Sequence, residues 1–152
     1  EALRISADLI DKGADLVALY RQALVSRPFE AMRYWGAGLN RLQRDEGIIW
    51  TTLTLDDRIN SNYQDNDDAD LINILSAIED VEIALIFVEQ INNIVKVSWR
   101  SNGKIDISEI AFNFGGGGHK AAAGAEIQGD LADVLESVIT ASKNLRNKAN
   151  IK

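Results

Sequence analysis

Six consecutive apolar residues, Ile83 to Val88, constrain the fold of this 152-residue chain more than any other feature. Such an unbroken run is typical of a β-strand that is buried on both faces. The next apolar segment, Ile94 to Arg100, alternates instead, which predicts a neighbouring strand with one apolar and one polar face. Asn92 and Asn93 predict the turn between the two strands. The expected apolar face carries Val95, Val97 and Trp99, and the polar face carries Lys96, Ser98 and Arg100.

The rest of the chain predicts helices before and around this pair of strands. Residues 1–45 carry apolar side chains at helical spacing, in two stripes separated by Pro28, and predict a helical arm. The second stripe consists of Phe29, Met32, Trp35, Leu39 and Leu42. Further strands are expected at 48–55 and 122–128, with a loop at 56–70. A short helix is expected after this loop, with an aspartate as its cap, and a second one is expected to begin with an Asp106–Glu109 capping box. A last helix is expected to begin after Asp130 and to fray from residue 143.

This order of elements predicts an α/β fold: a small mixed β-sheet packed with helices and preceded by an N-terminal helical arm. We expect residues 1–45 to be a linker or arm and residues 46–152 to be one domain. No apolar run approaches the roughly 18 residues that span a bilayer, so no membrane partner is expected. The chain has no cysteine, which excludes disulfides, thiolate nucleophiles and cysteine-ligated zinc. A cytoplasmic location is the expectation.

The net charge of −7 argues against a broad surface for nucleic acid, which would be basic. It leaves room for a small, focused phosphate site, and Gly115 to Gly118 followed by His119 and Lys120 suggests one. Glycine N–H groups in a run can surround an anion. The alternative is a flexible loop or a helix C-cap, because Gly115 directly follows an expected helix. One glycine would suffice for a cap, and four cost roughly 0.5–1 kcal/mol each relative to alanine.

Two named phosphate motifs do not fit the glycine run. The spacing from Gly116 to Ala121 matches the dinucleotide fingerprint, but it follows a helix instead of a strand. A P-loop needs Gly-Lys-Ser/Thr, whereas Gly103-Lys104 is followed by Ile105. The acidic segment 65–70 also fails the spacing of a calcium loop. It is interpreted as a solvated loop with a helix cap.

His119 and Arg100 are the side chains best suited to hold a phosphate beside this run. His119 is the only histidine, so with no cysteine to share it a metal site is not expected, and an imidazole can donate to a phosphate oxygen. Arg100 ends the polar face of its strand, where most arginines are merely solvated. Its planar fork also suits bidentate phosphate contact. The sequence does not establish whether Arg100 lies near the glycine run.

Three segments between Val95 and Gly124 resemble the C-terminal DHH-associated domain of DHH phosphoesterases, most closely the oligoribonuclease and pAp phosphatase (nanoRNase) group. They match the patterns K-V-S-x-R-S, V-D-V-S-x-I-A and F-G-G-G-G-H-x-x-A-A-G. Trp99 stands where leucine is commoner in that family. In this sequence the segments are Lys96–Ser101, Ile105–Ala111 and Phe114–Gly124.

The resemblance implies a division of labour between two domains. An N-terminal DHH domain, expected to lie outside this chain, binds two manganese ions and is catalytic, so no catalytic residue, metal ligand or cofactor is expected here. The present domain holds a short RNA or nucleotide substrate, and a homodimer is allowed. The residues implied in substrate binding are Arg100, Ser101, Gly115, Gly116, Gly117, Gly118, His119 and Lys120, with Ser101 and Lys120 as neighbours of the others.

Two other functions stay open on the sequence. One is a non-catalytic RNA-binding module like the C-terminal domain of alanyl-tRNA synthetases, which has a related glycine-rich motif. The acidic charge disfavours it. The other is a dimerisation domain in which the glycine run is only a turn.

Overall fold

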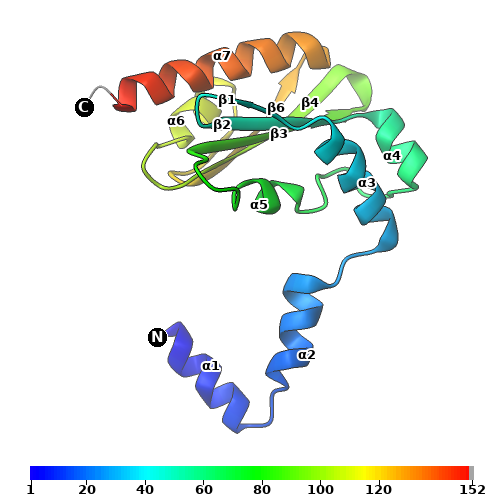
Figure 1. Cartoon of the computed structure of the whole chain (residues 1–152), viewed down its shortest axis with the longest axis vertical. Helices are drawn as coiled ribbons and strands as arrows, with labels where there is room; N and C mark the ends of the chain where they lie inside the picture. Colours follow the sequence, from blue (N-terminus) through cyan, green and yellow to red (C-terminus); the bar gives the residue numbers. More distant parts are fainter. Residues whose placement is uncertain (151–152) are drawn as a thin grey trace.

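The computed structural model describes residues 1–150, in which a six-stranded sheet has helices on both faces (Figure 1). The strands are β1 (Gln43–Asp45), β2 (Ile48–Leu53), β3 (Ile83–Gln90), β4 (Ile94–Ser101), β5 (Gly117–His119) and β6 (Ala122–Gln128). Their order in the sheet is β1-β2-β3-β4-β6-β5. β2 and β3 are parallel and every other pair is antiparallel. The predicted α/β fold with a small mixed sheet is therefore confirmed.

The helices fall into an N-terminal arm and a set that packs on the sheet. They are α1 (Ala2–Asp11), α2 (Leu16–Tyr20), the π-helical turn η1 (Arg21–Val25), α3 (Phe29–Asn40), α4 (Leu55–Ser61), α5 (Leu71–Leu75), the 3-10 turn η2 (Ile91–Asn93), α6 (Ser108–Asn113) and α7 (Leu131–Asn150). No helix among residues 1–150 is long and apolar enough to cross a membrane.

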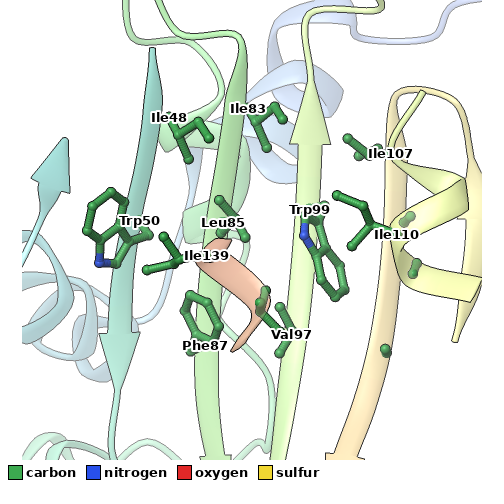
Figure 2. Packing of buried hydrophobic residues seen from close by; sticks show 14 of the residues in the cluster. Ile48, Trp50, Ile83, Leu85, Phe87, Val97, Trp99, Ile107, Ile110 and Ile139 are labelled. Carbon is green, nitrogen blue, oxygen red and sulfur yellow. The ribbon is translucent and has the colours of Figure 1, made fainter. Parts of the chain in front are cut away.

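One face of the sheet is closed by α6 and α7, and we call it the covered face. Its core is dense: Trp99 is fully buried, its ring stacks with Phe114 at a centroid distance of 6.4 Å, and its indole N–H donates to the Ser142 hydroxyl (3.3 Å). Figure 2 shows Trp99 among the isoleucine, leucine and phenylalanine side chains of the central strands. The alternation predicted for β4 is confirmed, because Val95 and Val97 are buried here with Trp99.

The opposite face, which we call the open face, is covered only in part. Helices α3 and α5 form a second apolar core against β2 and β3. The run predicted as a doubly buried strand is therefore confirmed: Leu85 and Phe87 face the first core, and Ala84, Ile86 and Val88 face the second. Exposure then rises from the half-buried polar residues of β4 to the exposed strand β5.

The face of α3 that packs on the sheet differs from the predicted apolar stripe. Trp35 and Leu42 of that stripe pack partly buried against the second core, whereas Phe29, Met32 and Leu39 are exposed. The fully buried residues of the helix are Ala31, Tyr34 and Gly38. A Cβ on Gly38 would lie 3.0 Å from Cδ2 atoms of both Leu53 and Leu71. The small residues therefore allow the helix to approach the sheet closely, which an apolar stripe does not reveal.

The arm that precedes α3 has no buried residue in α1, α2 or η1. Figure 1 shows it projecting away from the sheet, on the side of α5. An ion pair between Arg27 and Asp70 (3.1 Å) joins the end of the arm to the loop before α5. Its apolar side chains are exposed to solvent, including Leu3, Leu9, Leu16, Val17, Leu19 and Leu24.

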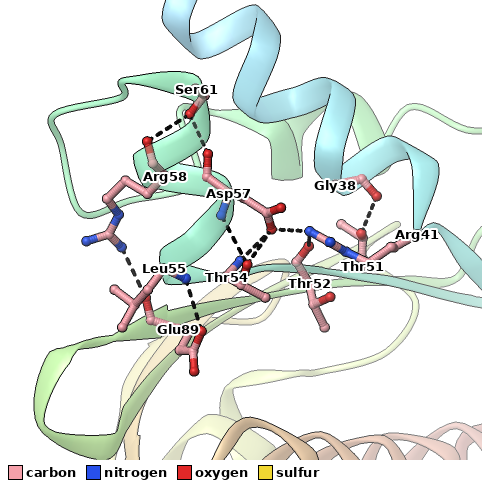
Figure 3. A network of polar contacts seen from close by, with 10 residues as sticks. All are labelled: Gly38, Arg41, Thr51, Thr52, Thr54, Leu55, Asp57, Arg58, Ser61 and Glu89. Atoms are coloured by element: carbon pink, nitrogen blue, oxygen red, sulfur yellow. Dashed lines mark hydrogen bonds and ion pairs between the residues drawn. The ribbon is translucent and has the colours of Figure 1, made fainter.

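Helix α4 lies where a loop was expected. Its formation is explained by the capping of its first turn. Thr54 accepts a hydrogen bond from the Asp57 N–H, and the Asp57 carboxylate accepts one from the Thr54 N–H (2.8 Å). This reciprocal capping box satisfies the first turn of the helix. Arg41 of the α3 end pairs with the same carboxylate (Figure 3). Burial alone would raise the pKa of Asp57, but the hydrogen bonds from Thr54 and Arg41 lower it below its ordinary value.

Three smaller expectations are refined or corrected. An aspartate caps the start of α5 as predicted, but it is Asp68, which accepts from the Ile72 N–H, and not Asp70. Asp106 and Glu109 form no capping box; Asp106 accepts from the Ser108 N–H and hydroxyl. The tail predicted to fray from residue 143 continues α7 as far as Asn150, and its last two residues lie outside the described part of the chain.

Candidate functional site

Strand order places Arg100 and His119 in one row. Arg100 of β4 lies opposite Ala122 of β6, and Ala122 lies opposite His119 of β5. Residues directly opposite in antiparallel strands have their side chains on the same face. Arg100 also lies opposite Ala84, which belongs to the second core, so the row belongs to the open face. The two side chains predicted to hold a phosphate are therefore separated only by the small side chain of Ala122.

The first half of the glycine run caps α6. Gly115 has φ +77°, and its N–H donates to the Phe112 carbonyl (3.0 Å), while the Gly116 N–H donates to the Ala111 carbonyl (2.8 Å). This pair of bonds is a Schellman motif. The expectation that all four amides surround an anion is wrong for these two, because their N–H groups are already paired within the helix end. For them the alternative interpretation, a helix C-cap, is correct.

The second half of the run forms β5, an edge strand that the sequence did not reveal. Gly118 has φ +149°, and a Cβ there would lie 2.5 Å from the Ala122 carbonyl oxygen, so only glycine fits. A Cβ on Gly117 would have no atom within 4 Å, so packing does not require glycine there. β5 pairs with β6 alone, and an edge strand leaves its outward backbone groups unpaired.

Ser101 and Lys120 fasten the β5–β6 hairpin to the end of β4. The Ser101 hydroxyl lies 2.8 Å from the Ile105 carbonyl and 3.2 Å from the Lys120 carbonyl, and it accepts from the Gly103 N–H. The Lys120 carbonyl also accepts from the Ile107 N–H (3.1 Å). These bonds hold the hairpin, and hence His119, beside the end of β4.

Both signs of charge lie around the hairpin. Arg100 and Lys120 carry positive charge and His119 adds an imidazole, and His119 and Lys120 are exposed. Asp106 is the nearby counter-charge: hydrogen bonds from Ser108 lower the pKa of its carboxyl, and Lys120 adds to the effect. Arginine, lysine and histidine donors with outward amides are suited to bind a phosphate. No group of three or more His, Cys, Asp or Glu residues fit to hold a metal ion exists within residues 1–150.

A shallow pocket of about 360 Å³ lies beside this row. The side chains of Lys96, Ser98 and Glu126 line it, together with Gly116 and Gly124. The remaining lining residues are Val97, Gly115 and Ala125, of which Val97 and Ala125 also belong to the first core.

The model of one protein family, described as DHHA1 domain, matches residues 52–145. The chain belongs to the DHHA1 family. The DHHA1 domain is the DHH-associated domain of DHH phosphoesterases, so the predicted resemblance is confirmed. The match includes β3, β4, β5 and β6, the end of β2, and all of the residues predicted to bind substrate.

Curated relatives share the domain and are longer. The chain is 31% identical over 150 residues to the "Bifunctional oligoribonuclease and PAP phosphatase NrnA" of Thermus thermophilus, which covers 98% of this chain and 45% of that protein. It is 43% identical over 70 residues to the protein of the same name from Mycoplasma genitalium, covering 45% of this chain and 22% of that protein. The chain thus spans less than half the length of these relatives.

A solved structure shows the same fold. An exopolyphosphatase-related protein from Bacteroides fragilis superposes with a TM-score of 0.85 at 24% identity, over 99% of this chain and 44% of that one. The superposition includes the N-terminal arm because nearly the whole chain is covered.

Sequence reasoning selected Arg100, His119, Lys120 and Gly117 for this candidate site, but it did not select Ser98 and Gly124, which lie in the same row as Gly117. Ser98, Gly124 and Gly117 form the next row along the strands, opposite one another on β4, β6 and β5. Gly124 is the last residue of the segment that matches the family pattern, but no role was predicted for it. Only the strand order β4-β6-β5 shows that two glycines lie side by side.

Proposed function

We propose that this chain is the substrate-binding domain of a phosphoesterase that hydrolyses short RNA or pAp, and that it binds a terminal phosphate of the substrate between Arg100 and His119. The observation that carries the proposal is the row from Arg100 through Ala122 to His119 on the incompletely covered face. The names of the relatives from Thermus and Mycoplasma support this substrate class.

The proposed binding mode differs from a nest of four glycine amides. The outward amides of β5 and the side chains of Arg100 and His119 donate to the phosphate, and Lys120 adds positive charge. Ser101, Gly115, Gly116 and Gly118 keep the hairpin in place. Held in this way, the substrate is oriented for reaction, and positioning of this kind accounts for a large part of many enzymes' rate acceleration.

The catalytic residues are proposed to belong to a DHH domain that precedes this chain. The described residues do not fit the two manganese ions expected of that family, since no suitable cluster of carboxylates and imidazoles is present among them. The charge of −7 is the reason to prefer a small-substrate site over a tRNA-binding module. A cytoplasmic location is retained as part of the proposal.

Calorimetric titration of the 152-residue chain with adenosine 3′,5′-bisphosphate tests the proposal. We expect saturable binding, and an Arg100→Gln variant should raise Kd about tenfold. A hydrogen bond to a charged group contributes about 1.5–3 kcal/mol, and 1.4 kcal/mol is a factor of ten. The variant His119→Ala should weaken binding by a smaller factor because the imidazole is a weaker donor.

Arg44→Gln is the matched control. Arg44 lies opposite Ile49, and Ile49 opposite Ala84, so Arg44 belongs to the same row of the sheet as Arg100 but at the other edge. This variant removes the same charge and should change Kd less than twofold. Equal effects of the two arginine variants, or no binding by the unmodified chain at millimolar ligand, would refute the proposal.

A further inference from the structure

Lys96 is a second cation on the open face, at a distance from Arg100 that one phosphate does not bridge. It lies opposite Val88 and Glu126, and Val88 belongs to the second core, which places Lys96 on the same face as Arg100. Three residues of strand lie between the two, and four steps along the strand correspond to about 13 Å between their Cα atoms. Lys96 is half-buried and lines the pocket beside the glycine run.

The contacts of the Lys96 side chain reveal no role in stabilising the fold. Lys143 pairs with Asp45 and Arg41 with Asp57, whereas Lys96 pairs with no carboxylate among residues 1–150. Among residues 1–150 the Lys96 ammonium has neither an ion pair nor a hydrogen bond, even though Glu126 lies directly opposite. A half-buried ammonium that lines a pocket and has no protein partner is available to a ligand.

The surface between the two cations is unusually flat. Ser98, Gly124 and Gly117 occupy the intervening row. A Cβ on Gly117 would enter open space, and one on Gly124 would meet only the Val97 carbonyl, at 3.3 Å. The floor between Arg100 and Lys96 is therefore made of backbone and one small hydroxyl side chain, on which a ribose or base can lie without a steric obstacle.

We infer that Lys96 binds the phosphate of a following nucleotide, so that the open face discriminates an oligonucleotide from a single nucleotide. This inference rests on the proposed function, since it takes Arg100 and His119 as the terminal phosphate site. Lysine suits the role because its ammonium is a compact point charge that contacts one oxygen without fixing the orientation of the strand.

The test compares 5′-phosphorylated adenosine mononucleotide, dinucleotide and trinucleotide (pA, pApA and pApApA) as ligands of the 152-residue chain. With the unmodified chain, each ligand's Kd is measured by calorimetry, and affinity should rise about tenfold where the added phosphate reaches Lys96. In Lys96→Met this gain should fall below twofold, while the Kd for pA stays within twofold of the unmodified value. Lys96→Arg should restore most of the gain.

Lys148→Met is the matched control for charge, because Lys148 is exposed on α7, which packs on the covered face. It should preserve the full gain with length. Circular dichroism melting verifies that each variant is folded, and Lys96→Gln replaces Lys96→Met if the latter melts early.

The outcomes separate this inference from the proposed function. Arg100→Gln should weaken all three ligands by one common factor. Length-independent binding by the unmodified chain, or an equal loss for pA and pApApA in Lys96→Met, would overturn the role of Lys96 and leave the terminal phosphate site intact. Failure of every ligand to bind would overturn both.

Discussion

The covered face and the open face of the sheet use the same strands for different purposes. On β4, Trp99 is fully buried against α6 and α7, while the adjacent Arg100 points to the other side, where no helix covers β6 and β5. The two faces differ in which helices pack on them and not in the strands that form them. We conclude that α6 and α7 stabilise the covered face along β4, whereas the second core stabilises the open face only over β2 and β3, so the part over β6 and β5 can expose cations and glycines that contribute little to folding.

The largest expected effect comes from the centre of the covered face. Trp99→Ala should lower the free energy of unfolding by about 3–5 kcal/mol, because it removes a large buried ring and leaves a cavity. Urea unfolding measured by circular dichroism gives the value. Phe112→Ala, in the adjacent helix α6 but with 76% of the phenylalanine exposed, should change it by less than about 0.5 kcal/mol. Similar losses in the two variants would contradict the contrast between buried and exposed aromatic residues.

A smaller effect is expected where the open face meets its edge. Gly118→Ala should cost about 1–3 kcal/mol, since φ is +149° and the added methyl group meets the Ala122 carbonyl. Gly117→Ala should leave stability within about 0.5 kcal/mol and instead weaken binding of adenosine 3′,5′-bisphosphate, because its methyl group protrudes from the floor. Unchanged binding by Gly117→Ala would favour a dimerisation domain, in which the run is only a turn.

The capping box of α4 should give a loss that depends on pH. Asp57→Asn should cost about 1 kcal/mol at pH 7, typical of a lost helix cap. The pKa of Asp57 is lowered in the folded state, so its stabilisation is present above the unfolded pKa and is lost as the pH falls through the folded pKa. Unfolding at pH 7 and below about pH 4 measures this difference. Asp56→Asn, in the same first turn, serves as the control; an equal, pH-independent loss would argue against the cap.

The smallest effect on stability is expected on the open face. Arg100→Gln should change the free energy of unfolding by less than about 0.5 kcal/mol, because within residues 1–150 its guanidinium donates one hydrogen bond, to the adjacent Trp99 carbonyl (3.1 Å), and forms no ion pair. Combined with weaker nucleotide binding, this result would show that Arg100 serves binding and not stability, in contrast to Trp99 on the same strand. A loss of stability as large as that of Gly118→Ala would instead make Arg100 a structural residue.

The elements that the sequence predicted correctly are those in which burial sets a periodic pattern. β3, β4 and β6 were found because their apolar residues are continuous or alternate. Helix α4 was missed because its signal is the Thr54–Asp57 capping box within a polar segment. The predicted packed face of α3 was incorrect in part. Glycine and alanine determine the close approach of α3 to the sheet, and their small size gives no apolar stripe.

The candidate site was predictable as a set of residue types and not as an arrangement. Arg100 and His119 were selected for their chemistry, but their proximity depends on β6 lying between β4 and β5. The glycine run was assigned a single purpose from sequence, whereas two of its residues cap α6 and two form the edge strand. Hydrogen bonds fixed by tertiary structure separate these roles, and local composition carries no trace of them.

The two edge strands of the sheet, β1 and β5, are each only three residues long. A margin this short offers another chain few backbone groups with which to extend the sheet, and such brevity is a known defence against aggregation. A domain whose ligand is proposed to lie along one of these margins can therefore keep that backbone accessible without inviting neighbouring molecules to polymerise on it.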